Sequence, residues 1–185
     1  IGRAALAVAL SAIGFSIGVP AIGTAAGLKR GDFILLGTAG YDRQPVLMKL
    51  DGTTLDTTRI ATSGLFEGSY DLAITTAGRI VLANGSGVVE VDPGTGSESV
   101  VLSTGALGGV PHGISAEASG SLFISIGGAT PRILRWAPPS GLTEVTAGGL
   151  LDNPGGLELG PDGMLYVANT EARVAEHIWY GKILR

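Results

Sequence analysis

The stretch NPGGLELGPDGMLYVAN at residues 153–169 decides the fold. Two short apolar segments flank a Pro-Asp-Gly turn, in which Pro161 fixes φ, Asp162 can bond its own backbone and Gly163 can adopt a positive φ. Two strands joined by a tight turn are therefore predicted. One hairpin cannot bury its apolar face alone, so further copies or another layer must cover it.

Two further copies of this stretch occur earlier in the chain. When Gly163 is set over Gly120 and Gly78, the segments PHGISAEASGSLFISI and SYDLAITTAGRIVLAN align with it, at spacings of 43 and 42 residues. RILR at residues 132–135 is answered by KILR at residues 182–185. Leucines recur upstream in the same frame, at Leu65, Leu107 and Leu150. These landmarks indicate a sequence repeat.

Each copy is followed by two more segments with strand character. VLMKLDG at residues 46–52 matches VVEVDPG at residues 88–94 as a third strand, and TTRIAT at residues 57–62 begins a series of fourth strands continued by SVVLST and LTEVTA. Each unit is thus four short antiparallel strands in about 42 residues, which is typical of a propeller blade. The predicted fold class is all-β, a β-propeller of four-stranded antiparallel blades.

About four blades are expected, and their predicted bounds are residues 28–64, 65–106, 107–149 and 150–185, the last one incomplete. A closed ring needs at least about four blades, and about six are expected for this type of repeat. The chain is therefore expected to be a fragment of a six-bladed ring, or to be completed by a partner, because an open stack leaves exposed strand edges. The first blade has no clear first strand.

A hydrophobic leader precedes the blades. Residues 4–28 carry no charge and lie between Arg3 and a Lys-Arg pair, and this pattern ends in small residues, as in a secretory signal peptide. Residues 1–27 are predicted to be a signal peptide, with a membrane anchor or a part of the fold as alternatives; Pro20 disfavours a spanning helix. The predicted location is secreted or periplasmic, with membrane contact only through this segment if it is uncleaved.

Composition excludes several functions. The formal net charge is −4, the pI is about 5.1 and no run of Lys or Arg occurs, so nucleic acid is not an expected partner. The chain has no cysteine, which excludes disulfides, thiolate metal sites and a cysteine nucleophile.

The repeat resembles that of the NHL-type propellers, which include gluconolactonase-like and streptogramin-lyase-like groups. Their repeat reads approximately Pro-x-Gly-Ile-x-Val-x-x-x-Gly-x-Leu-Tyr-Val-Ala-Asp/Asn, and it is similar to PGGLELGPDGMLYVAN and PHGISAEASGSLFISI. The resemblance covers residues 65–185 well and residues 31–64 loosely. It implies the fold, whereas activity depends on sites placed on that fold.

The lactonase-like enzymes bind a metal through Asn or Asp residues just before the glycine that opens the first strand, at the central channel. The corresponding residues here are Tyr70, His112 and Gly155, with Asp71 and Asn153 as neighbours. A hard cation needs several oxygen ligands, so no metal site is predicted from these blades. The cofactor stays unknown, and a divalent cation in the complete protein stays open.

The segment Val-Pro-His-Gly-Ile at residues 110–114 resembles the Pro-His-Gly-Ile of streptogramin lyases, in which the histidine acts in an elimination. In those enzymes a Glu precedes the proline, where this chain has Val110. The resemblance makes His112 the candidate catalytic residue. The alternatives are a hydrogen-bonded loop histidine between blades and, for Asp71, a carboxylate that bonds backbone N–H groups of the neighbouring blade.

Candidate ligand-binding residues at the channel mouth are therefore Tyr70, Asp71, His112 and Asn153. Asn84 and Asn169 are expected to form turns, and the aromatic segment at residues 177–180 could contact a partner or glycan. The expected function is that of an extracytoplasmic binding module for a small molecule, a carbohydrate or a protein. A lactonase- or lyase-type enzyme and a structural module of a larger secreted protein are the alternatives.

Overall fold

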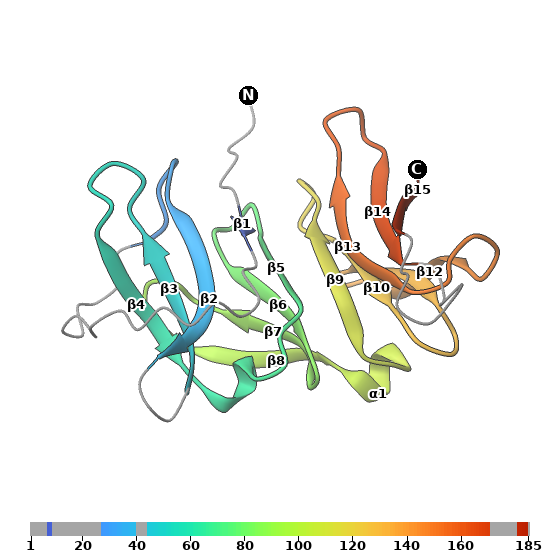
Figure 1. Cartoon of the computed structure of the whole chain (residues 1–185), viewed down its shortest axis with the longest axis horizontal. Helices are drawn as coiled ribbons and strands as arrows, with labels where there is room; N and C mark the ends of the chain where they lie inside the picture. Colours follow the sequence, from blue (N-terminus) through green and yellow to red (C-terminus); the bar gives the residue numbers. More distant parts are fainter. Residues whose placement is uncertain (1–6, 9–26, 40–43, 171–180, 185) are drawn as a thin grey trace.

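The protein is described here by a computed structural model, which describes residues 7–8, 27–39, 44–170 and 181–184. Four β-sheets follow one another along the chain and lie side by side (Figure 1). We call them the first to the fourth blade. Their strands are β1 (Ala7–Val8), β2 (Phe33–Ala39), β3 (Gln44–Leu50) and β4 (Thr57–Thr62); β5 (Asp71–Ile74), β6 (Ile80–Asn84), β7 (Gly87–Val91) and β8 (Glu98–Ser103); β9 (Pro111–Ala116), β10 (Leu122–Ile126), β11 (Arg132–Ala137) and β12 (Gly141–Ala147); and β13 (Pro154–Leu159), β14 (Leu165–Thr170) and β15 (Gly181–Leu184).

The second and third blades are four-stranded antiparallel meanders, as the repeat predicts, with the orders β5-β6-β7-β8 and β9-β10-β11-β12. The fourth blade has three described strands in the order β13-β14-β15. In the first blade β2, β3 and β4 are antiparallel, and β1 lies parallel to β2 in the place of a first strand. The predicted all-β propeller fold is confirmed.

The three glycines that define the repeat occupy the same corner in successive blades. Gly78, Gly120 and Gly163 have φ values of 77°, 87° and 77°, which side chains other than glycine rarely adopt. Each donates its N–H to the carbonyl three residues earlier, at 2.9, 2.9 and 3.0 Å. The turn chemistry of the sequence therefore sets the hairpin between the first and second strands of each blade.

The core lies between neighbouring blades. Strand β6 is buried over its whole length, and its successive side chains point to opposite faces. Leu82 packs with the first blade, in a cluster that includes Leu47, and Val81 packs with the third blade, in a cluster that includes Ile124. Fully burying each such side chain contributes about 1.5–3 kcal/mol, so each blade is stabilised mainly by the blades beside it.

Two short helical turns connect consecutive blades and were not predicted: η1 (Gly64–Phe66) and α1 (Thr104–Leu107). Each begins after a serine at the end of an outer strand. Ser63 Oγ accepts a hydrogen bond from the Leu65 N–H at 3.0 Å, and Ser103 Oγ accepts one from the Ala106 N–H at 3.2 Å. These serine caps turn the chain from the outer strand of one blade toward the next blade.

Asn84 and Asn169 do more than form turns. Both are buried, with 0% and 1% of their surface exposed. Asn84 Nδ2 donates to the Leu65 carbonyl, and Asn169 Nδ2 donates to the Leu150 carbonyl at 3.0 Å. In both blades the amide thus ties the end of the second strand to the segment that leads into the first.

The third blade ties down the same segment with a different residue. Ile126 stands in the place of the asparagine, and Arg132 Nη2 donates to the carbonyls of Leu107 and Gly108, at 2.8 Å each. The carbonyl that needs a donor is retained, while the donor comes from the third strand.

The predicted leader at residues 1–27 lies outside the described residues, except for Ala7, Val8 and Gly27. Within the described parts of the chain, no helix has the length and apolar character needed to cross a membrane.

Candidate functional site

The predicted site residues lie where the innermost strands of three blades begin. Tyr70 immediately precedes β5, His112 is the second residue of β9, and Asn153 immediately precedes β13. These strands pack against one another in sequence, β5 on β9 and β9 on β13 (Figure 1). One candidate side chain from each of three blades is therefore brought to the same end of the inner strands.

Glycines let the inner strands approach closely. A Cβ atom on Gly113 would lie 2.2 Å from the Gly155 carbonyl oxygen and 2.9 Å from the Gly156 Cα. Ser125 Oγ donates to the same Gly155 carbonyl at 2.5 Å. The backbones of β9 and β13 are therefore in contact at this end, which fixes how far apart His112 and Asn153 can lie.

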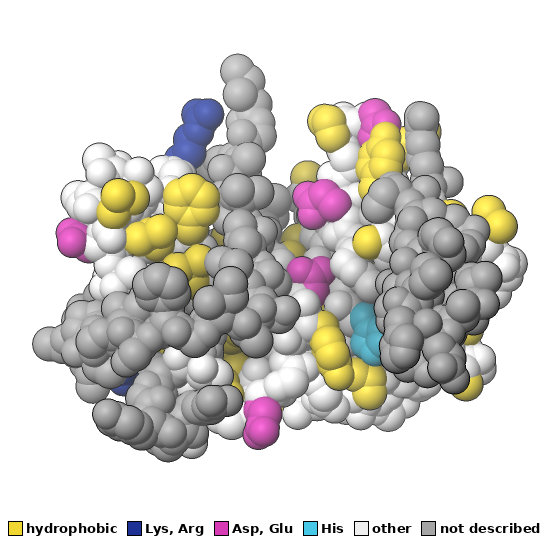
Figure 2. All heavy atoms as spheres, in the orientation of Figure 1, with side chains coloured by type: hydrophobic (Ala, Val, Ile, Leu, Met, Phe, Trp, Pro, Cys, Tyr) yellow, Lys and Arg dark blue, Asp and Glu magenta, His cyan; other side chains and the backbone are white. Residues whose placement is uncertain are grey.

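Tyr70 and His112 form an aromatic pair across the boundary between the second and third blades. Their ring centroids are 5.0 Å apart, with an interplanar angle of 47°. Tyr70 is 55% exposed and His112 is half-buried. Figure 2 shows a histidine at the surface of this face, with apolar side chains next to it. The pair therefore leaves much of the tyrosine ring open to solvent.

Asn153 completes the group from the fourth blade. A Cβ atom on Gly127 would lie 2.3 Å from His112 Nδ1 and 2.5 Å from Asn153 Oδ1, so the imidazole and the amide both pack on this glycine. Asn153 Oδ1 also accepts a hydrogen bond from the Gly128 N–H at 3.4 Å. The two glycines that follow β10 therefore form the floor of the site.

Asp71 lies between blades. Its Oδ2 accepts a hydrogen bond from the Ile114 N–H of the third blade at 3.0 Å, and its Oδ1 accepts one from the Leu72 N–H at 2.9 Å. This is the structural alternative expected for a carboxylate at this position. Burial raises the pKa of Asp71 to about 6 against the opposing effect of the two backbone bonds, and nearby Glu158 raises it further.

Several polar groups of the site have no partner within the described residues. No hydrogen bond to the Tyr70 hydroxyl, the His112 ring nitrogens or Asn153 Nδ2 occurs among these residues. These groups can donate or accept bonds to a bound molecule, and an imidazole can also transfer a proton. Among the described residues, no three His, Cys, Asp or Glu side chains come together in a way that could hold a metal ion.

The sequence singles out the three side chains but not the two glycines on which His112 and Asn153 pack. Gly127 and Gly128 directly follow the second strand of the third blade. The second blade has Gly85 and Ser86 at these positions, so the second glycine was the only available signal against that blade. The aromatic segment predicted as a contact surface, residues 177–180, lies outside the described residues.

No protein-family model matches the sequence, and no curated protein matches it significantly. Among solved structures, streptogramin B lyase superposes with a TM-score of 0.52 and 18% identity, over 73% of this chain and 46% of that chain. A PQQ-bound aldose sugar dehydrogenase from Streptomyces coelicolor superposes with a TM-score of 0.47 and 22% identity, over 59% of this chain and 39% of that chain. TolB from Acinetobacter baumannii superposes with a TM-score of 0.45 and 15% identity, over 87% of this chain and 51% of that chain.

All three are β-propeller proteins, and this chain spans about half of their length or less. At these identities the likeness concerns the fold. The equivalent corners, the antiparallel blades and the superposition on streptogramin B lyase together identify the chain as a β-propeller repeat protein.

Proposed function

We propose that the chain belongs to a binding module whose ligand contacts Tyr70, His112 and Asn153 at the mouth of the propeller channel. The observation that carries this proposal is the convergence of three side chains from three blades, each with polar atoms that have no partner within the described residues. A rigid scaffold with such groups at its loops and strand ends is a common form of binding site.

The chemistry of the face favours a small molecule or a carbohydrate. The exposed ring of Tyr70 offers an apolar surface for a flat or ring-shaped group, while its hydroxyl, the imidazole of His112 and the amide of Asn153 offer directional hydrogen bonds. Asp71 serves this site indirectly, since both of its oxygens hold backbone N–H groups. A protein partner that inserts a side chain here is the remaining class.

Thermal-shift screening against simple sugars and a small-molecule library tests the proposal. Ligands that bind the native state raise its melting temperature. Hits should stabilise the wild-type protein and fail to stabilise Tyr70→Ala and His112→Ala. Val145→Ala changes an exposed residue on the outer strand β12 and is the matched control, which should respond like the wild type. Hits that stabilise all four proteins equally would place binding elsewhere.

An elimination catalysed by His112 is the second candidate. The superposition on streptogramin B lyase and the segment at residues 110–114 favour it, and no hydrogen bond among the described residues engages the imidazole, which can act as a base. Val110, 37% exposed, stands where the lyases have a glutamate and cannot supply a carboxylate. The chain covers 46% of that lyase, so the activity belongs to the complete protein.

Mass spectrometry of a lactone or streptogramin B incubated with the complete protein distinguishes these activities. An elimination leaves the summed mass of the products equal to that of the substrate, whereas hydrolysis adds one water. Loss of the reaction in His112→Ala supports the enzyme, and unchanged substrate with ligand binding intact supports the binding module alone.

The hydrophobic leader supports an extracytoplasmic location for this module. Fractionation of cells that express the complete protein tests it, and recovery in the cytoplasmic fraction with residues 1–27 intact would contradict it.

A further inference from the structure

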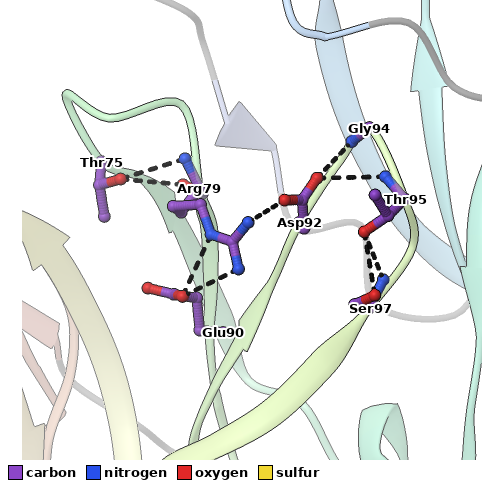
Figure 3. A network of polar contacts seen from close by, with 7 residues as sticks. All are labelled: Thr75, Arg79, Glu90, Asp92, Gly94, Thr95 and Ser97. Atoms are coloured by element: carbon purple, nitrogen blue, oxygen red, sulfur yellow. Dashed lines mark hydrogen bonds and ion pairs between the residues drawn. The ribbon is translucent and has the colours of Figure 1, made fainter.

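Two positions near the hairpin corner carry a charge pair in the first and second blades. In the second blade, Arg79 directly precedes β6 and Glu90 lies on β7. The Arg79 guanidinium bonds Glu90 Oε1 through Nε and Nη2, at 3.1 Å each, and also bonds Asp92 (Figure 3). The second strand of this blade therefore begins with a cation, and the third strand presents an anion to it.

The first blade has the opposite charges at the same two positions. Asp32 directly precedes β2, and Lys49 lies on β3 with its Nζ 3.8 Å from Asp32 Oδ2. The register establishes the equivalence, because Lys49 pairs with Ile34 as Glu90 pairs with Val81. Asp32 is 1% exposed and Lys49 is 8% exposed, so this pair is buried.

The third blade again has a cation on its third strand, but Ser121 stands in the place of Arg79 and Asp32, and the anion comes from the end of the hairpin that precedes β10. Arg135 on β11 pairs with Phe123, which makes it the equivalent of Glu90 and Lys49. Its Nη2 bonds Glu117 Oε2 at 2.7 Å and Ser121 Oγ at 2.9 Å. Both partners lie at the hairpin corner around Gly120. The third strands of the first, second and third blades therefore carry a cation, an anion and a cation.

Because of this alternation, the third strand of one blade would place a like charge opposite the hairpin of a neighbouring blade. If the first and second blades exchanged their third strands, Asp32 would face Glu90 and Arg79 would face Lys49. If the second and third blades did so, Arg79 would face Arg135. Asp51 and Asp92 hold the same turn position in the first and second blades, and each accepts two backbone N–H bonds. These two carboxylates therefore do not distinguish the first blade from the second.

The energetics favour a role in selecting strand partners over a role in stabilising the folded state. Arg79, Glu90, Glu117 and Arg135 are about one-third exposed, and ion pairs this exposed contribute little to folding. Like charges placed opposite each other are destabilising, and a buried Asp32 without its cation is much more so. Repeats with near-identical backbones are prone to wrong pairing during folding.

We propose that the alternating charge pairs direct the third strand of each of the first three blades to the hairpin of its own blade, and so prevent the exchange of third strands between these adjacent blades.

Refolding yields test this proposal. The variant Arg79→Asp/Glu90→Lys keeps an ion pair but reverses it. The third strand of the second blade then carries a cation, as the third strands of both neighbouring blades do. After dilution from urea, we expect a yield of native monomer about fivefold below that of the wild type, with more dimer and aggregate, since one incorrect pairing preference can change populations by that factor. The exchange also removes the cation that pairs with Asp92, so the yield should fall further than the change in the equilibrium unfolding midpoint accounts for.

A combined variant supplies the decisive comparison. Glu117→Lys/Arg135→Glu alone removes the difference at one boundary, between the second and third blades, and should give an intermediate yield. When this exchange is added to the second-blade exchange, the third strands of the second and third blades again carry opposite charges. The yield should therefore rise to this intermediate level. A structural role for the pairs predicts the opposite, because four substitutions should fold less well than two.

A yield for the combined variant no better than that of the second-blade exchange would overturn the proposal. So would a second-blade exchange that refolds like the wild type, or one whose yield falls only as far as its equilibrium stability does. Because Glu117 and Arg135 are partly exposed, their exchange gives a test at the second boundary even if the second-blade exchange fails to fold.

Discussion

The rings of Tyr70 and His112 lie 5.0 Å apart, centroid to centroid, although each belongs to a different blade. Tilted aromatic pairs at such a distance contribute about 0.5–1.5 kcal/mol beyond the area they bury. Because Tyr70 is 55% exposed, the lower half of that range is expected here.

A double-mutant cycle with Tyr70→Leu and His112→Ala, followed by urea unfolding, measures this coupling. We expect a coupling free energy of about 0.5–1 kcal/mol and little loss of overall stability in either single variant. A coupling of zero would mean that the rings do not meet in solution.

Gly127→Ala should disturb the site while leaving the fold in place. The new Cβ would lie 2.3 Å from His112 Nδ1 and 2.5 Å from Asn153 Oδ1, which are side-chain atoms that can move away. We expect large NMR shift changes for His112 and Asn153 with a stability loss below about 1.5 kcal/mol. Gly85→Ala, where a Cβ meets nothing within 4 Å, is the control and should leave both residues unshifted.

Gly113→Ala should instead destabilise the fold. Here the Cβ would meet backbone, 2.2 Å from the Gly155 carbonyl oxygen, so β9 and β13 must separate. We expect a loss of about 2–3 kcal/mol in the free energy of unfolding, as for other overpacked sites. A loss like that of Gly85→Ala, about 0.5 kcal/mol or less, would show that the two inner strands are not in contact.

Asp71 should make stability depend on pH. Its pKa is raised to about 6 in the folded state from an ordinary value of 3.8, so the folded state favours the protonated form. The associated stability is fully present below pH 3.8 and is lost as the pH rises through 6.

Comparison of the wild type with Asp71→Asn isolates this effect, because the other carboxylates titrate in both proteins. Between pH 4 and pH 7, the free energy of unfolding of the wild type should fall relative to that of the variant by up to about 2 kcal/mol, allowing for partial screening by solvent. A difference that stays constant, or that changes with the opposite sign, would show that Asp71 is not buried between the blades.

Asn84→Ala should be among the more damaging single substitutions. It leaves the Leu65 carbonyl without its side-chain donor and removes the acceptor of the Ser86 N–H, in a residue that is fully buried. We expect a loss of about 2–3 kcal/mol, from the urea midpoint. Asn169→Ala should behave alike, since it breaks the equivalent bond to Leu150. A change below about 0.5 kcal/mol in both would contradict the tying role.

The hairpin corners could be predicted from the sequence because their chemistry is local. Gly78, Gly120 and Gly163 need a positive φ, and each forms its turn with residues only three positions away. The fourth strands followed from their spacing, and β4 (Thr57–Thr62) lies on the segment predicted for it.

The repeat alignment does not predict the burial of residues whose neighbours come from distant parts of the chain. Leu107 and Leu150 occupy the same position of the repeat, yet Leu107 is 2% exposed and Leu150 is 71% exposed, because Leu151 is the buried side chain in the fourth blade. The buried role of Asn84 depends on a carbonyl 19 residues away. Such outcomes depend on how the blades pack, which turn chemistry and period do not encode.

The positions of the candidate side chains within the repeat could be predicted from the sequence, whereas the contacts between them could not. Tyr70 and His112 were expected at the same point of consecutive blades, but their contact depends on the distance between β5 and β9, which Asp71 and the inner-strand glycines control. Asn153 was expected beside this position, and its packing against Gly127 had no counterpart in the other repeats.

The inner strands of consecutive blades converge and bring Tyr70 and His112 together. A nuclear Overhauser spectrum of the protein, with the His112 ring protons assigned by means of His112→Ala, tests this contact most directly. We predict cross-peaks between the two rings and a ring-current shift of His112 that disappears in Tyr70→Leu. Absence of these cross-peaks, with His112 unshifted in Tyr70→Leu, would contradict the claim.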